Sequence, residues 1–170
     1  MAFTCILQRP SAGSTVVNDP KADEEAEFDT DHDSLVIVAT SQLSTTDCRF
    51  EMSGFGKDSW GMNVSYDLSV VLEQLPELLA GLRAGERAEI DFYSQGVERM
   101  LYFDRQGADV VIRCVSKLDP GPPPAVEVAR YEELLEMFVT LASEFAASLE
   151  MTGSRFAAME PFVSWRAGKA

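Results

Sequence analysis

The sequence contains very little histidine and no recognisable catalytic motif. Its single histidine, His32, lies in an acidic segment rather than beside a serine or cysteine nucleophile, so neither a Ser/His/Asp nor a Cys/His arrangement is credible. The glycines form neither a GxGxxG fingerprint nor a P-loop, which leaves nucleotide binding by those routes unsupported. We predict that the protein is not an enzyme and has no catalytic residue, with catalysis by carboxylates alone left as the alternative.

Cysteine is also scarce, with Cys5, Cys48 and Cys114 widely spaced and no CxxC pair among them. This pattern argues against both a disulfide framework and a zinc site, and favours buried free thiols. The alternating aspartates of residues 29–33 resemble part of a calcium loop, but the glycine at its bend and the closing glutamate are missing. We therefore expect no metal ion and no cofactor.

Basic residues are outnumbered: 14 Lys and Arg stand against 28 Asp and Glu, which gives a net charge of −14. This charge repels nucleic acid and anionic membrane surfaces, because binding phosphate requires Lys or Arg to displace counterions. We expect neither nucleic acid nor membrane as a partner, and a basic protein surface is the electrostatic complement. Solubility alone is the other explanation of the charge.

Long hydrophobic runs are absent from the sequence. No run approaches the ~20 residues that a transmembrane helix needs, and the N-terminal segment lacks the basic start and long apolar region of a signal peptide. We therefore predict a cytoplasmic protein. Its 170 residues suit one domain that spans residues 1–170.

Acidic residues are concentrated in one stretch. They are Asp19, Asp23, Glu24, Glu25, Glu27, Asp29, Asp31 and Asp33, with Lys21 as the basic exception. Like charges at this density repel and resist packing, so we predict a mobile loop over about residues 19–33. This loop is either simply solvated or an acidic arm that meets a basic surface. A second irregular stretch is the Pro-rich linker at residues 119–124.

The clearest predicted helix covers residues 67–85, where leucine and valine recur at the 3.6-residue period. Asp67 suits its first turn and Gly85 suits a left-handed residue after its last turn. Pro76 lies inside this stretch and predicts a kink or a break after Leu75. The apolar stripe must be covered, and a sheet made from the flanking segments is the natural cover.

A second long helix is predicted over residues 130–151. Its outer face carries Glu132, Glu133, Glu136, Glu144 and Glu150, and no Lys or Arg occurs between Arg130 and Arg155. Such an uncompensated acidic face indicates a partner, since like charges one turn apart destabilise a helix. The tail after this helix contains four large apolar side chains that either pack on the body or form an exposed anchor. They are Phe156, Met159, Phe162 and Trp165.

The remaining pattern is that of short strands. Strands are predicted over residues 2–8, 35–41, 48–54, 60–66, 88–93, 98–104 and 108–115, with a short edge strand around Val126 and Val128. The runs 48–54 and 60–66 should form a hairpin, and the three after the first helix should form an antiparallel meander. The predicted fold is α+β: an antiparallel sheet of about six strands, one helix inserted in the strand order and one long C-terminal helix packed on the sheet.

Four predicted elements follow one another along the chain: a strand with Trp60, the helix DLSVVLEQLPELLAGLRAG, the meander EIDFYSQ…ERMLYFD…DVVIRCV and a leucine-rich terminal helix. This order resembles that of the small immunity proteins of bacterial polymorphic toxin systems. The similarity covers about residues 35–149 and is one of layout. The resemblance implies that the protein binds a cognate toxin and neutralises it by occluding the active site of the toxin. The toxin would act on nucleic acid, for example as a nuclease or deaminase. The candidate contacts with the toxin are Asp23, Glu24, Glu25, Glu27, Asp29, Asp31, Glu132, Glu133 and Glu136.

Other functions stay open at the level of the sequence. One is a small-molecule or peptide-binding domain without catalysis, with a pocket between sheet and helices. Another is a subunit of a larger assembly, although the immunity interpretation predicts a monomer or a weak homo-oligomer.

Overall fold

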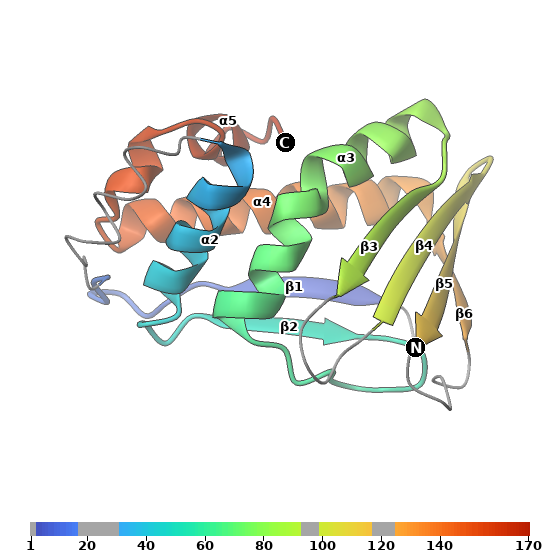
Figure 1. Cartoon of the computed structure of the whole chain (residues 1–170), viewed down its shortest axis with the longest axis horizontal. Coiled ribbons are helices and arrows are strands. Elements are labelled where there is room, and N and C mark those ends of the chain that lie inside the picture. The colour runs from blue at the N-terminus through green and yellow to red at the C-terminus, as the bar shows by residue number, and fades with distance from the viewer. Residues whose placement is uncertain (1–2, 17–30, 93–98, 117–124) are drawn as a thin grey trace.

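The computed structural model describes residues 3–16, 31–92, 99–116 and 125–170, which form two antiparallel sheets and several helices (Figure 1). The predicted α+β class is confirmed, whereas the single sheet of about six strands is wrong. The strands are β1 (Thr4–Gln8), β2 (Arg49–Ser53), β3 (Ala88–Phe92), β4 (Arg99–Gln106), β5 (Asp109–Ser116) and β6 (Val126–Arg130). The helical elements are α2 (His32–Leu43), the π-helical turn η1 (Val64–Leu68), α3 (Ser69–Ala84), α4 (Tyr131–Met151), the 3₁₀ turn η2 (Arg155–Ala158) and α5 (Phe162–Arg166). None of the described helices has the length and hydropathy to cross a bilayer.

The larger sheet is the antiparallel meander that the sequence predicts. Its order is β3-β4-β5-β6, so each strand pairs with its neighbour in the chain. Alternate residues, among them Ile90, Phe103 and Ile112, are fully buried on its inner face. There α3 contacts β3 and β4, while α4 contacts β5 and β6. The two long helices therefore share the cover of this sheet.

The smaller sheet pairs β1 with β2, which are far apart in the sequence. The predicted hairpin of residues 48–54 and 60–66 is wrong, because the first run is β2 but pairs with β1, and the second run is not a strand. The N–H of Trp60 still donates to the carbonyl of Met52 (2.9 Å), and its ring lies 6.4 Å from that of Phe92. Trp60, Met62 and Val64 pack on the core without strand pairing, whereas Tyr66 is exposed.

The predicted strand over residues 35–41 is also wrong, because these residues lie inside α2. Asp31 caps this helix, since its carboxylate accepts hydrogen bonds from two backbone N–H groups of the first turn (2.9 and 3.1 Å). Residues at helical spacing then bury one face completely: Val36, Ala39 and Leu43. This tertiary packing overrides the strand preference of the β-branched residues. The end of the predicted acidic loop, residues 31–33, is therefore the start of α2.

The first predicted helix begins earlier than expected and ends where expected. Asn63 caps η1, because its side-chain oxygen accepts from the N–H of Ser65 (2.7 Å). The carboxylate of Asp67 instead accepts from the N–H of Asn63 (2.7 Å), which gives a reciprocal pair of caps. Gly85 adopts the left-handed conformation (φ 73°) and ends α3 as predicted.

Pro76 does not break α3, which continues through it and changes direction partway along its length (Figure 1). Proline cannot donate to the carbonyl of the residue four positions earlier, here Leu72. The Nε2 of His32 lies 3.1 Å from that carbonyl oxygen and donates the missing hydrogen bond. The only histidine is therefore a structural residue that links α2 to α3.

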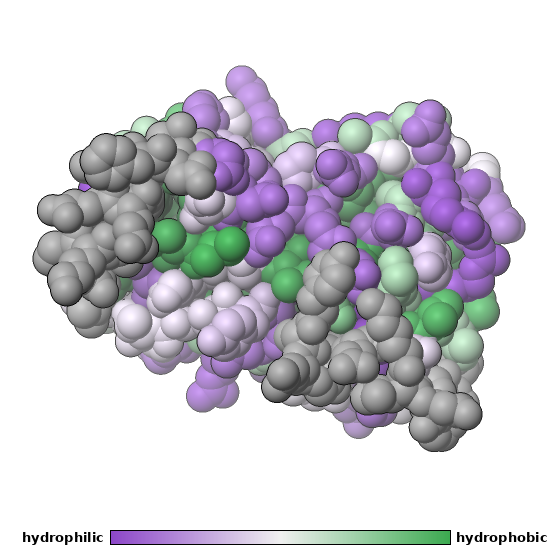
Figure 2. Space-filling model, in the orientation of Figure 1, coloured by the Kyte–Doolittle hydropathy of each residue, from purple (hydrophilic) through white to green (hydrophobic). Residues whose placement is uncertain are grey.

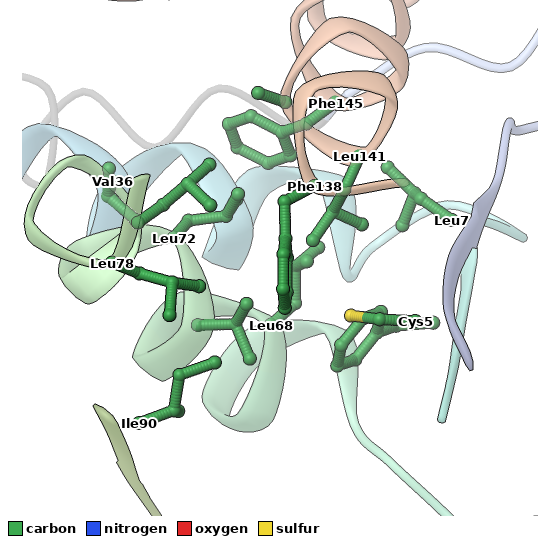
Figure 3. Packing of buried hydrophobic residues seen from close by; sticks show 14 of the residues in the cluster. Cys5, Leu7, Val36, Leu68, Leu72, Leu78, Ile90, Phe138, Leu141 and Phe145 are labelled. Atoms are coloured by element: carbon green, nitrogen blue, oxygen red, sulfur yellow. The ribbon is translucent and has the colours of Figure 1, made fainter. Parts of the chain in front are cut away.

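One cluster of buried side chains draws on both sheets and on helices α2 to α5. Figure 3 shows Leu7 of β1, Val36 of α2 and Phe138 of α4 directed toward a common centre. The ring of Phe138 lies 6.5 Å from that of Phe3 and 5.8 Å from that of Phe103. Through these rings α4 connects the smaller sheet to the larger one.

The C-terminal tail packs back on the body, which is the first of the two alternatives that the sequence leaves open. Phe156 and Phe162 are fully buried and Trp165 is nearly so. The described residues on the face that carries α2, α3 and the larger sheet are mostly hydrophilic, with small separate hydrophobic areas (Figure 2).

Candidate functional site

The larger sheet has two edge strands, β3 and β6, and α3 blocks the first of these at Asp91. The side-chain Nε2 of Gln74 donates to the carbonyl of Asp91 (3.1 Å), and its Oε1 accepts from the N–H of Asp91 (2.9 Å). One side-chain amide thus replaces the backbone of a neighbouring strand. This edge has no free position there for another chain.

Among the described residues, nothing pairs with the outer edge of β6. A hydrogen bond from the N–H of Cys114 to the carbonyl of Ala125 (2.9 Å) fixes which residues of β6 bond to β5. Because bonded residues alternate along an antiparallel strand, Ala129 bonds to β5, while the backbone groups of Val126 and Val128 point away from it. No hydrogen bond from another described residue reaches these groups. As whole residues, Val126 and Val128 are 47% and 60% exposed.

A groove runs beside this edge, between β6 and the first turns of α4. Its hollow of about 330 Å³ is lined by Phe3, Asp109, Val128, Ala129, Arg130, Glu133, Leu134 and Met137. A second hollow of about 300 Å³ continues along α4 to β1 and shares Glu133 and Met137 with the first. It is lined also by Cys5, Ile6, Leu7, Glu136, Thr140, Leu141 and Glu144. We call the two hollows together the β6–α4 groove.

The charge of the β6–α4 groove is negative and uncompensated. Glu133 and Glu136 are exposed, and the described residues provide no ion pair to either of them. The basic side chain in the lining, Arg130, is already paired with Asp109 (2.8 Å). A positively charged side chain that enters the groove would therefore find two free carboxylates above an apolar floor.

The acidic face of α4 is less uniform than the sequence predicts. Glu144, at the far end of the groove, forms an ion pair with Arg9, and this hydrogen bond raises the pKa of the Arg9 guanidinium. Glu150 forms another with Arg166 (2.9 Å). The basic partners come from outside α4, so only the acids near the start of the helix are left unpaired in the described structure.

The structure brings together two of the predicted contact residues, Glu133 and Glu136. Glu132 lies outside the groove and lines a neighbouring hollow with Arg105 and Tyr131. Asp31 is the N-cap of α2, an element that does not line the groove. The other predicted contacts, Asp23, Glu24, Glu25, Glu27 and Asp29, lie outside the described residues, as does the Pro-rich linker 119–124.

Asp104 on the outer face of the larger sheet is paired with two arginines. Asp104 accepts hydrogen bonds from both Arg87 (2.8 Å) and Arg113, and the bond from Arg87 is the main reason that the pKa of Asp104 is lowered. Arg87 also lies over the ring of Tyr102 at 5.3 Å. Around Asp104 the surface of the sheet therefore has no unpaired carboxylate, unlike the groove.

Catalytic or metal chemistry finds no support in the described part of the chain. No group of three His, Cys, Asp or Glu side chains there could hold a metal ion. The three cysteines are free and buried, as predicted. Burial raises the pKa of the Cys5 thiol strongly and that of Cys48 to about 11, so both are protonated and poorly nucleophilic near neutral pH.

No protein-family model, curated protein or solved structure matches this chain. The function has to be argued from the groove itself. Sequence reasoning missed its apolar members, chiefly Ile6, Val128 and Met137, because their exposure depends on how α4 lies against β1 and β6. The available signal was the short strand at Val126 and Val128, since valine on an edge strand is exposed when nothing covers the edge.

Proposed function

We propose that the protein is an immunity-type inhibitor that binds a cognate basic toxin domain through the β6–α4 groove and so occludes the active site of the toxin. The proposal depends on one observation: within the described residues, Glu133 and Glu136 are exposed and without ion pairs, in an apolar groove that begins beside the unpaired edge of β6. This combination offers charge for steering the encounter and apolar surface for burial after contact.

The net charge of −14 supports the same proposal. It accelerates association with a basic partner by orders of magnitude and makes the rate sensitive to salt. A toxin domain that acts on nucleic acid, as a nuclease or deaminase, carries a basic substrate groove that an acidic inhibitor can cover. The inhibitor would act in the cytoplasm of the cell that makes the toxin.

Binding of a small molecule in the interior receives less support. The space between α4 and the larger sheet is filled by aromatic rings such as those of Phe3, Phe103 and Phe138. The hollows of the groove lie at the surface and follow α4, a shape that suits a segment of a protein better than an enclosed metabolite.

The test is a charge reversal in the groove. The toxin domain is first identified by co-purification from native cells at low and raised salt, and is then produced alone. The double variant Glu133→Lys/Glu136→Lys should bind it roughly 100-fold more weakly or worse, because two attractive pairs become repulsive. Titration calorimetry measures the affinity, and a nuclease or deaminase assay measures the inhibition.

The matched control is Glu77→Lys/Glu86→Lys, which changes the net charge equally at exposed acids on and just after α3. It should retain inhibition apart from a small change in association rate. The proposal is wrong if the two double variants inhibit equally well, or if the captured domain is not inhibited by the unaltered protein.

A further inference from the structure

We infer that the partner contributes an extended segment that pairs with the open edge of β6 as a fifth strand of the larger sheet, with a Lys or Arg directed at Glu133 and Glu136. This inference rests on the proposed function and specifies how the toxin domain is held.

The backbone of β6 provides the first argument. Val126 and Val128 direct their N–H and C=O groups away from β5, and no described residue bonds to them. The same sheet closes its other edge at Asp91 with the amide of Gln74. Strand addition uses main-chain groups of this kind for affinity, so β6 is the edge at which a fifth strand can form.

The lining of the groove provides the second argument, because it sets the side chains of the added strand. Alternate side chains of a strand point to opposite faces of the sheet. Those on the inner face enter the hollow over Phe3, Leu134 and Met137, where an apolar residue fits. A basic residue on the same face reaches the unpaired Glu133 and Glu136, which line the groove further along α4.

Charge selects this occupant over a second copy of the chain. Pairing two β6 strands would bring the grooves of two acidic molecules together, with Glu133 and Glu136 of each near the other. The basic side chain of the lining, Arg130, is already paired with Asp109. A basic segment of another protein neutralises the groove, whereas a second copy doubles its charge.

Amide hydrogen exchange reports directly on this edge. In the free protein the amides of Val126 and Val128 should exchange rapidly, while that of Ala129, bonded to β5, is protected. Addition of a strand should slow the exposed pair by about tenfold or more and leave Ala129 little changed. Side-chain docking without strand pairing would not produce this alternation.

The probe for the first experiment is a displayed library of random peptides of about 10 residues, long enough to span a typical strand. Enriched peptides should alternate Lys or Arg with apolar residues and should slow exchange at Val126 and Val128 in the full-length protein. The inference is overturned if no peptide is enriched, or if the enriched peptides leave exchange at these amides unchanged. A stable dimer of the protein alone that protects β6 would also overturn it, by assigning the edge to a second copy.

Two variants at one position separate strand pairing from general contact. Val128→Pro removes an outward N–H without removing a bond to β5, and proline is tolerated at such an edge position. Val128→Thr keeps both the N–H and the branched shape. The peptides should lose at least about tenfold in affinity for the proline variant and retain affinity for the threonine variant. Circular dichroism verifies that both are folded, and the exchange pattern of the unaltered protein decides the matter if the proline variant is not.

The same variants distinguish this inference from the proposed function. If Val128→Pro still neutralises the toxin domain while Glu133→Lys/Glu136→Lys does not, strand addition is wrong and the inhibitor proposal stands. If neither substitution affects neutralisation, the groove is not the binding surface and both fail.

Discussion

At the β3 edge of the larger sheet, Gln74 of α3 bonds both backbone groups of Asp91, whereas at the β6 edge Val126 and Val128 present theirs with no described partner. The side chains of the two edge strands also differ. β3 carries Glu89 and Asp91 between its buried residues, while β6 exposes two valines. Acidic side chains discourage unwanted pairing at an edge, and valines favour it.

The difference indicates that the open edge is not a general weakness of the fold. The chain blocks one edge at Asp91 with a single side-chain amide, and α4 lies beside the other edge without supplying an equivalent. Instead α4 places Glu133 beside it and Glu136 further along the same groove, and no described residue forms an ion pair with either. A closed edge protects the monomer, and an open edge with unpaired charge beside it is typical of a surface that is completed by another molecule.

The largest effect on stability is expected from weakening the packing of α4, which forms one wall of the β6–α4 groove. Phe138→Ala should lower the free energy of unfolding by about 3–5 kcal/mol, because it removes a fully buried ring between Phe3 and Phe103. Denaturant titration measures the loss. Thr140→Ala, at an exposed position on the same helix, is the control and should have little effect. A loss below about 1 kcal/mol would show that α4 is not the joint between the sheets.

The second prediction opens the β3 edge. Gln74→Met keeps the length of the side chain but leaves the N–H and C=O of Asp91 without their amide partner, at a cost of about 1–3 kcal/mol. Hydrogen exchange at Asp91 should become faster in parallel. Val128→Ala at the open edge is the comparison and should change stability by about 0.5 kcal/mol or less. Equal losses at the two edges would remove the distinction between them.

The third prediction concerns the helix that closes β3. His32→Ala should cost about 1 kcal/mol, because the carbonyl of Leu72 loses its donor. Pro76→Ala restores a backbone N–H to that carbonyl, so the same histidine substitution should cost less in this background. A double-mutant cycle by denaturant titration measures the coupling. Strict additivity of the two substitutions would mean that His32 does not compensate for the proline.

The smallest effect on stability has the opposite sign. Glu136→Lys should stabilise the protein by about 0.2–0.5 kcal/mol, because a like-charge pair with Glu132 one turn earlier becomes an attractive one. The same substitution should weaken toxin binding. Thermal unfolding and titration calorimetry on one preparation test both statements. A variant that is less stable and binds unchanged would show that the acids at the start of α4 are not kept for a partner.

The parts of the fold that were predicted correctly depend on local pattern. The meander β3–β6 and the helix α4 follow from alternation or helical period within one stretch of chain. The pairing of β1 with β2 joins segments that are far apart in the sequence, and no local pattern indicates it. The apolar alternation of residues 60–66 instead predicts a hairpin that does not form. The predicted strand over residues 35–41 is wrong for a related reason. The β-branched composition of these residues favours a strand, and only their packing in the folded protein favours the helix α2.

The candidate site divides in the same way. Glu133 and Glu136 could be singled out because no basic residue follows them on α4. The sequence does not predict that Glu144 pairs with Arg9 and Glu150 with Arg166, because both arginines come from outside the helix. The difference between the two sheet edges was also out of reach, because it depends on Gln74 meeting Asp91 across the packed interface of α3 and β3.

The sequence of α2 affects how readily the unfolded protein aggregates. Residues 35–41 are apolar or small, uncharged and free of proline, a composition that stacks readily into intermolecular sheets. Folding conceals this potential by burying Val36 and Ala39. Directly before it in the chain stand the acids of residues 19–33, whose like charges act as gatekeepers against aggregation. We therefore expect the acidic segment to reduce aggregation of the newly made chain before α2 packs on the core, independently of any contact that it makes with a partner.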